Sequence, residues 1–193
     1  MLTPIVIQQT MKGERAYDIF SRLLEDRIVW VSDHIEAYNA PTVVAQLLFL
    51  ASQSDEDIQL YVNSPGGVVN EGNAILDCMD WIKCDVSTIC IGQAASMGSL
   101  ILSNGTRGKR FVLPRSLVML HQPSGAMAYG KASDIERSFN QLMDTKMELA
   151  KTLAKNCNHP LEKIIIDFDR DFFMNAQEAV DYGIVDAILT QSP

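Results

Sequence analysis

Short runs of β-branched and apolar residues alternate along the whole chain with segments of helical periodicity. This alternation predicts strands at residues 28–32, 58–63, 86–91, 111–113, 117–121 and 184–189. Between them, apolar side chains recur at helical spacing within residues 14–26, 41–52, 73–83 and 133–157. Strands that alternate with helices at this spacing predict crossover connections and parallel pairing, and therefore an α/β fold. In such sheets the functional groups gather at the carboxyl ends of strands.

The length and charge of the chain narrow its class further. With 193 residues and no Pro-, Gly- or Ser-rich linker, we expect one domain over residues 1–193. The formal charge of −8 argues against binding to nucleic acid or to an anionic membrane surface. No apolar run reaches the ~18 residues that a membrane span needs. The first residues also lack the basic region of a secretory signal.

Cysteine, histidine and basic residues give no sign of a metal or nucleic-acid site. The four cysteines form no Cys-x-x-Cys pair and lie among apolar residues, which predicts buried free thiols in a reducing compartment. The three scattered histidines have no metal-ligand spacing, so we expect no metal. We interpret the basic stretch at residues 107–110 as a solvated turn.

Ser96 stands in a turn of small residues, Gly92-Gln-Ala-Ala-Ser-Met-Gly98, which follows the predicted strand at residues 86–91. We expect a helix to begin at this turn and to continue into residues 99–103. Free N–H groups at the start of that helix would favour a developing negative charge. Ser96 is therefore a candidate nucleophile, with the Met97 N–H as one oxyanion donor. The alternative is that Ser96 only caps the helix, because serine is a preferred N-cap residue.

A second turn of small residues, Asn63-Ser-Pro-Gly-Gly67, follows the predicted strand at residues 58–63. Two glycines permit a tight turn with exposed backbone N–H groups, so Gly67 is a candidate for a second oxyanion donor. An ordinary strand-to-helix turn explains the same residues, since Pro-Gly is a common turn signal.

His121 ends an apolar strand and precedes Gln122-Pro123, so a rigid element holds it where a general base could act. A structural role is the alternative. If His121 acts as a general base, a carboxylate would have to orient its imidazole. Asp167, Asp169 and Asp171 are all candidates, and we expect flanking phenylalanines to bury Asp171. Spacing alone does not choose among the three.

Four motifs in this order resemble those of the ClpP family, the proteolytic subunits of ATP-dependent Clp proteases. They are Asn63-Ser-Pro-Gly-Gly67, Gly92-Gln-Ala-Ala-Ser-Met-Gly98, Met119-Leu-His-Gln-Pro123 and Arg170-Asp-Phe-Phe173, and the likeness extends over residues 13–189. The resemblance implies a serine endopeptidase that hydrolyses unfolded proteins and short peptides. It implies Ser96 as nucleophile, His121 as base and Asp171 as orienting acid, with oxyanion donors at Gly67 and Met97.

The same resemblance implies how a substrate binds. An extended peptide would lie between the segment after the Gly-Gly turn and the segment after His-Gln-Pro, as an added strand that tolerates many sequences. The residues implied as substrate-binding are Gly66, Val68, Val69, Pro123, Ser124 and Gly125.

The resemblance further implies a ClpP/crotonase-like fold of repeated β-β-α units and an assembly of two stacked seven-membered rings. The ring would be homo-oligomeric or mixed with a paralogue, in the cytoplasm or in an organelle. An N-terminal axial segment at about residues 1–17 and a handle of a long helix plus a strand at about 122–157 are implied. Arg170 would form an oligomer contact.

An AAA+ unfoldase of the ClpX, ClpA or ClpC type is the partner that the resemblance implies. The unfoldase would use the ATP, and this subunit would need no cofactor. The implied docking pocket consists of Tyr61, Trp81, Ile91, Phe111 and Leu189.

Two other functions remain open on the sequence. The chain is alternatively a non-catalytic ring subunit of a mixed assembly, although such subunits usually lose a member of the triad. A crotonase-type acyl-CoA enzyme on the same fold would need neither Ser96 nor His121, since fold does not dictate function.

Overall fold

The structure is a computed structural model that describes residues 3–10, 13–125 and 129–191. Its centre is a sheet of seven strands, in which β3 (Ile28–Ser32), β4 (Ile58–Ser64), β5 (Val86–Ala95), β6 (Arg110–Val112) and β9 (Ala187–Ile188) lie side by side in parallel. The expected α/β fold with a parallel sheet is confirmed.

Strand β5 is longer than predicted because it serves two neighbours. Its first half pairs with β6, and its last residues pair in parallel with β7 (Leu117–Leu120). The change of neighbour occurs around Gly92, whose φ of 80° suits glycine. The short strand β8 (Phe172–Met174) then runs antiparallel to β7. The ends of β5 and β7 are thereby adjacent, with the start of β8 beside them.

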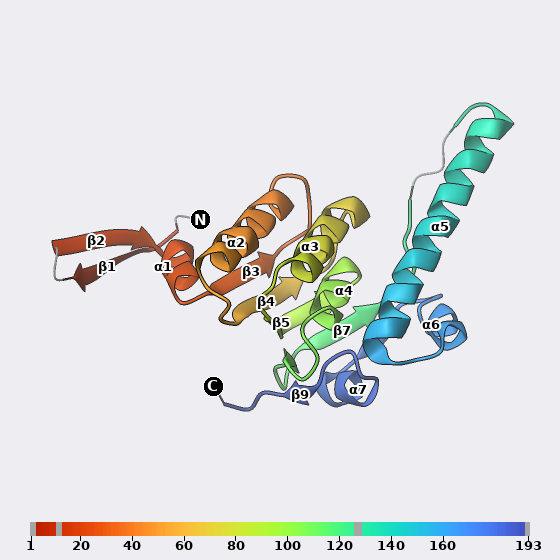
Figure 1. The fold of residues 1–193 in the computed structure, drawn as a ribbon. Coiled ribbons are helices and arrows are strands. Elements are labelled where there is room, and N and C mark those ends of the chain that lie inside the picture. Colours follow the sequence, from red (N-terminus) through yellow and green to blue (C-terminus); the bar gives the residue numbers. More distant parts are fainter. Residues whose placement is uncertain (1–2, 11–12, 126–128, 192–193) are drawn as a thin grey trace.

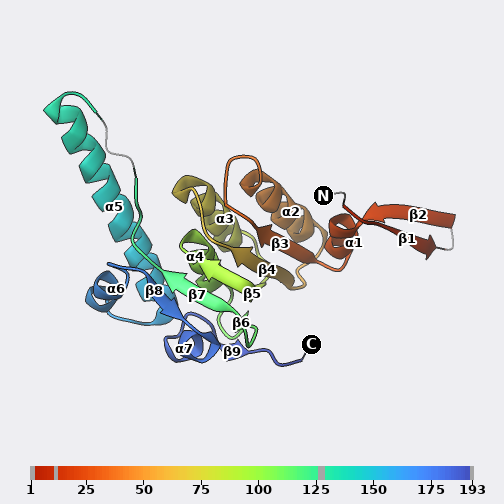
Figure 2. The same cartoon turned by 180° about the vertical axis from the view of Figure 1, so that it is seen from behind.

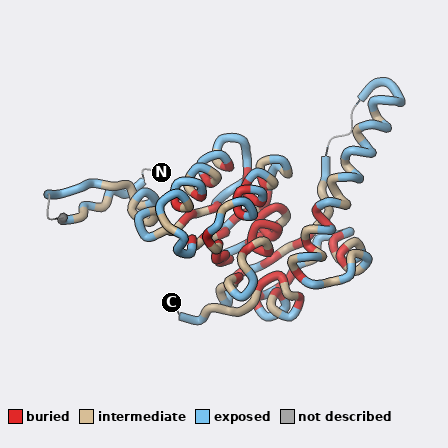
Figure 3. Tube along the Cα trace, in the orientation of Figure 1, coloured by how far each residue is buried: buried red, intermediate tan, exposed pale blue. Residues whose placement is uncertain are grey.

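Three helices cover one face of the sheet (Figure 1): α2 (Ala40–Gln53), α3 (Val69–Trp81) and α4 (Met97–Ser103). Figure 2 shows the opposite face, where the strands lie toward the viewer. The core fills the space between these helices and the sheet, as the buried segments of Figure 3 show. Leu47, Leu60 and Ile101 are fully buried there. This packing gives the strand ends a rigid base.

The prediction of a helix over residues 14–26 is wrong in its first half. Residues there form β2 (Gly13–Asp18), which pairs with β1 (Ile5–Thr10) in an antiparallel hairpin that extends away from the sheet (Figure 1). Helix α1 (Ile19–Glu25) begins only after Asp18, whose carboxylate caps it by accepting from the N–H groups of Phe20 and Ser21. The cap signal at Asp18 would have located this start.

Helix α5 (Ala132–Cys157) closely matches its predicted bounds and projects beyond the body of the molecule (Figure 1). The strand expected beside it in the handle is not found within residues 122–125 and 129–131. A strand needs a hydrogen-bonding neighbour, and this segment runs beside a helix. Residues 126–128 of the expected handle lie outside the described residues.

The C-terminal part holds two elements outside the predicted helix and strand ranges, α6 (Leu161–Asp167) and β8. Asn175 and Glu178 form a capping box at the start of α7 (Ala176–Asp181). The strand predicted at residues 184–189 shrinks to the two residues of β9. Ile184 and Val185 instead donate to the Ala179 carbonyl and pack into the core.

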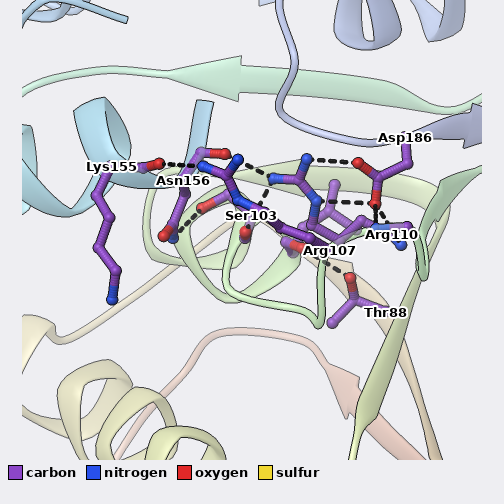
Figure 4. Close-up of polar contacts among 9 residues, drawn as sticks. Thr88, Ser103, Arg107, Arg110, Lys155, Asn156 and Asp186 are labelled. Carbon is purple, nitrogen blue, oxygen red and sulfur yellow. Dashed lines mark hydrogen bonds and ion pairs between the residues drawn. The ribbon is translucent and has the colours of Figure 1, made fainter. Parts of the chain in front are cut away.

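The interpretation of residues 107–110 as a solvated turn holds for Arg107 and Gly108, which form an exposed turn, but it is wrong for Arg110. Arg110 is 5% exposed, and its guanidinium donates to both oxygens of Asp186 and to the carbonyls of Ser103 and Asn156 (Figure 4). Lys109 lies 2.6 Å from Asp57 and 2.8 Å from Asp85. Arg110 therefore joins β6, the end of α5 and the residue before β9 through a largely buried ion pair. The pairs of Lys109 are partly exposed, and they connect it to the residues directly before β4 and β5.

All four cysteines are free and buried, as expected. Within the described ranges, no helix is long and apolar enough to cross a membrane. In the same ranges, His, Cys, Asp and Glu side chains form no group of three that could hold a metal ion.

Candidate active site

Ser96 lies between the end of β5 and the first residue of α4. Its N–H donates to the Met119 carbonyl on β7 at 3.0 Å, which fixes the backbone at the end of the parallel pair. Its φ of 54° and ψ of −125° are values that residues other than glycine rarely adopt. Such strain is concentrated at functional sites, because the surrounding structure has to hold it in place.

The alternative role of Ser96 as a helix cap does not fit the structure. Its hydroxyl makes no capping hydrogen bond, and it has no other partner among the residues that the structure describes. The Ser96 carbonyl instead accepts from the Ser99 hydroxyl at 2.6 Å and from the Ser99 N–H. The hydroxyl of Ser96 is therefore available for chemistry.

His121 follows β7 directly, so it lies at the carboxyl end of the strand next to Ser96's strand. The side chain is 31% exposed. The register of the antiparallel pair β7–β8 places Leu120 opposite Phe172, and this brings His121 opposite Asp171. The His121 Nδ1 atom lies 3.2 Å from the Asp171 Oδ1 atom. An imidazole held in this way keeps its second nitrogen for another partner.

The three candidate carboxylates have separate partners. Asp167 accepts from the Tyr182 hydroxyl at 2.7 Å and pairs with Lys163. Asp169 accepts from the Gln122 side chain at 3.2 Å and so ties down the residue after His121. Asp171 is the carboxylate that contacts His121.

The expectation that phenylalanines bury Asp171 is wrong, because its side chain is 61% exposed in the chain. Phe172 packs against Tyr182, and Phe173 is itself 54% exposed. Neither ring covers the carboxylate. Arg170 beside it is 93% exposed and lies 3.7 Å from Asp169, so its side chain is open to a partner.

The Gly-Gly turn lies against Ser96 and against the loop after β3. A Cβ added to Gly66 would lie 2.5 Å from the Ser96 Cβ, and one added to Gly67 would lie 2.2 Å from the Ile35 carbonyl oxygen. Ile35 pairs with this turn by donating to the Gly66 carbonyl and accepting from the Val68 N–H. Both positions therefore require glycine. Sequence reasoning missed Ile35, although an apolar residue after the polar stretch at residues 32–34 is a signal of burial.

The two expected oxyanion donors are free in the structure. The N–H groups of Gly67 and Met97 donate to no acceptor within the described part of the chain. Because Ile35 bonds to the residues on either side, the Gly67 N–H faces away from the loop after β3. Free N–H groups beside a serine hydroxyl suit the stabilisation of a developing oxyanion.

A cavity of about 380 Å³ lies beside this cluster. Five of the expected substrate-binding residues line it, namely Val68, Val69, Pro123, Ser124 and Gly125. Its other wall comes from α5, with Ser138, Gln141, Leu142 and Thr145. Sequence reasoning missed this wall, because the helical spacing of Ser138, Gln141 and Thr145 becomes a signal only once the neighbouring loop is known.

The residues of the expected docking pocket are brought together in part. Tyr61 and Leu189 line one cavity of about 360 Å³, and Ile89 and Leu113 line it too. Phe111 pairs with Ile89 across the strands β5 and β6. Ile91 and Trp81 are not among the lining residues, and Trp81 lies at the end of α3 with 77% exposure.

This arrangement unites a free serine hydroxyl, a histidine with a carboxylate partner and two free N–H groups. Such a set suits nucleophilic acyl transfer. A comparison with models of known protein families matches residues 11–192 to the model described as Clp protease. The match covers nearly the whole chain, including every residue of the cluster.

Proposed function

Because this chain belongs to the Clp protease family and is a peptidase of the ClpP type, we propose that it is a serine endopeptidase with Ser96 as its nucleophile. His121 is the general base, and Asp171 orients it. The observation that carries the proposal is the 3.2 Å contact between His121 Nδ1 and Asp171 Oδ1, at the strand end next to a strained serine with a free hydroxyl. A base held by a third group is the signature of an activated nucleophile.

The proposed reaction has two stages. His121 Nε2 accepts the proton of Ser96 Oγ as that oxygen attacks the scissile carbonyl, and the imidazolium then gives the proton to the leaving amine. Water hydrolyses the resulting acyl-Ser96 ester by the same proton route. The Gly67 and Met97 N–H groups hold the oxyanion, and Asp171 stabilises the charged imidazolium.

The hydroxyl of Ser96 and the ring of His121 make no hydrogen bond in the structure. We expect this bond to form in the assembled, substrate-bound enzyme, because catalytic hydrogen bonds in substrate-free proteins are often long or poorly aligned. The substrate lies as an extended strand between the segments at residues 66–69 and 123–125. Backbone pairing there explains acceptance of many sequences, including unfolded proteins and short peptides.

Members of the Clp protease family generally form oligomeric rings that work with AAA+ unfoldases. For this chain we propose two stacked heptameric rings, homo-oligomeric or mixed with a paralogue. The unfoldase of the ClpX, ClpA or ClpC type uses the ATP and docks at the cavity of Tyr61 and Leu189, with Phe111 beside it. Four free thiols suit a reducing compartment such as the cytoplasm or an organelle interior.

Covalent labelling with a serine-directed fluorophosphonate tests the role of Ser96. The assembled parent should react, and each chain that reacts should carry a single adduct. Peptide mapping should place this adduct on Ser96. Ser96→Ala should gain none, and His121→Ala should label much more slowly because the hydroxyl loses its base. An assembled parent that stays unlabelled would point to a non-catalytic ring subunit.

A further inference from the structure

The cavity between the Gly-Gly turn and α5 lies next to the proposed catalytic groups, because residues that line it closely follow those groups in the sequence. Gly66 contacts Ser96, and the cavity begins at Val68, directly after the proposed oxyanion donor Gly67. On the other side it begins at Pro123, two residues after His121. A peptide whose scissile carbonyl points at Gly67 would therefore present the side chain of that same residue to the cavity. Its volume of about 380 Å³ accommodates one side chain.

The described residues that line this cavity give it an apolar side and a polar side without charged groups. Val68, Val69 and Leu142 give it an apolar side. The remaining polar lining carries hydroxyl and amide groups, from Asn70, Ser124, Ser138, Gln141 and Thr145. No Asp, Glu, Lys, Arg or His is among the described residues that line it.

The polar side chains that line the cavity, on α5 and at Asn70 of α3, differ in the hydrogen-bonding groups that they leave free for a ligand. The Ser138 hydroxyl donates to the Asp134 carbonyl at 3.0 Å, and the Thr145 hydroxyl donates to the Gln141 carbonyl at 2.9 Å. Their protons are used, and their lone pairs remain as acceptors. The side-chain amides of Gln141 and Asn70 hydrogen-bond to no residue in the described ranges, so each keeps both donors and an acceptor.

We propose that this cavity selects an uncharged side chain with an amide group, glutamine above all, at the substrate residue that supplies the scissile carbonyl. Gln141 and Thr145 are the specificity-determining residues, and the inference rests on the proposed peptidase function. Glutamine places its methylenes against Val69 and Leu142 and its amide against the polar wall. Leucine leaves that wall without partners, and glutamate or lysine loses its hydration without meeting an opposite charge.

Hydrolysis of four matched fluorogenic peptides tests this selection. They differ only in the residue before the cleaved bond, which is glutamine, leucine, glutamate or lysine. For the assembled parent we expect a kcat/KM for glutamine about tenfold above each of the others, since a site that hydrogen-bonds a side chain rejects analogues that lack the group. A parent that prefers leucine or a charged residue overturns the proposal.

Variants of Gln141 and Thr145 on α5 test whether these residues cause the preference for the glutamine peptide. The double variant Gln141→Leu with Thr145→Val should prefer the leucine peptide, and Gln141→Glu should move the preference to lysine. Thr152→Val is the matched control, because Thr152 makes the same bond to the carbonyl four residues earlier but does not line the cavity. This control should keep the parent's order, and an unchanged order in the α5 variants also overturns the proposal.

Peptide binding separates a failure of this inference from a failure of the proposed function. The affinities of the four peptides for assembled Ser96→Ala are measured by fluorescence anisotropy, with and without the α5 changes. If the parent hydrolyses no peptide, the serine-peptidase proposal fails. The order of the four binding affinities then still tests whether the cavity prefers glutamine. Tightest binding of glutamine supports the cavity assignment, and equal binding of all four peptides contradicts it.

Discussion

His121 and Asp171 face each other across the antiparallel strands β7 and β8, with the Nδ1 and Oδ1 atoms 3.2 Å apart. Fifty residues separate them in the chain. Strand pairing sets their geometry, because Leu120 and Phe172 are direct partners in the register. Strand β7 also pairs with β5, which ends at Ser96. One sheet therefore places three side chains from distant segments at a common edge.

Asp171→Asn should lower kcat for peptide hydrolysis about 10⁴-fold while the assembly mass stays unchanged, because an amide no longer stabilises the charged imidazole. Asp169→Asn is the control: this carboxylate contacts Gln122 and Lys146 instead of His121. Steady-state kinetics on both variants measures the difference. Equal losses of activity would show that the contact with His121 has no special role.

Gly67→Ala should lower kcat/KM by about 100-fold or more, since an added Cβ would lie 2.2 Å from the Ile35 carbonyl oxygen and move the oxyanion donor. Gly108→Ala is a suitable comparison, because a Cβ there meets nothing within 4 Å, although its φ of 84° adds some backbone strain. Full activity in Gly67→Ala would exclude this N–H from the oxyanion site.

Arg110→Met should lower the free energy of unfolding by about 3 kcal/mol, because it leaves the Asp186 carboxylate without its main partner. Arg107→Met removes a single hydrogen bond to the Lys155 carbonyl from an exposed side chain and should cost far less. Urea unfolding at pH 7 compares the two variants with the parent. Equal stabilities of the two variants would mean that the buried pair of Figure 4 contributes nothing special.

The same pair makes a prediction about pH. Burial alone would raise the pKa of Asp186, but hydrogen bonds from the Arg110 side chain and backbone outweigh it and hold the pKa below its usual value. A carboxyl with a lowered folded-state pKa stabilises the fold above the unfolded pKa of about 4. That contribution is lost as the pH falls through the lower folded value. The gap in stability between parent and Arg110→Met should therefore narrow below about pH 4, and a gap that stays constant down to pH 2 contradicts the linkage.

Burial raises the pKa of Cys90 to about 12 and that of Cys157 to about 12. Both thiols should therefore stay protonated at pH 8 and react slowly with iodoacetamide in the folded chain, because the thiolate is the nucleophile. Mass spectrometry after timed alkylation measures the rates, and unfolding in urea should raise them steeply. Rapid labelling of the native protein at either position would contradict this burial.

The sequence predicted the elements whose periodicity reflects the core. Strand β3 has the predicted bounds, and α5 differs by one residue, because their apolar faces contact the sheet or the body of the molecule. Local pattern failed at the hairpin, where residues with helical spacing pair as β2 with β1. It also failed at Arg110, since a run of basic residues does not show that Asp186, 76 residues away, lies beside it.

The sequence indicated the residues of the candidate site one by one, but it did not indicate how they are arranged in space. Small residues around Ser96 and the Gly-Gly turn indicated close backbone approach, and the structure shows that approach at Gly66 and Gly67. Spacing did not distinguish Asp171 from its neighbours, because the choice depends on the pairing of β7 with β8. The exposure of Asp171 was missed because the neighbouring phenylalanines are engaged elsewhere or exposed: Phe172 packs against Tyr182, and Phe173 is itself 54% exposed.

The most direct test of the account is hydrolysis of a short fluorogenic peptide by the parent beside Ser96→Ala, with the assembly mass of both samples measured by light scattering. Short peptides should enter a ring chamber without an unfoldase. The account predicts hydrolysis by the parent and a loss of about 10⁶-fold in kcat for the variant at equal assembly mass. Equal hydrolysis by the two proteins, or none by a fully assembled parent, would contradict Ser96 as the nucleophile.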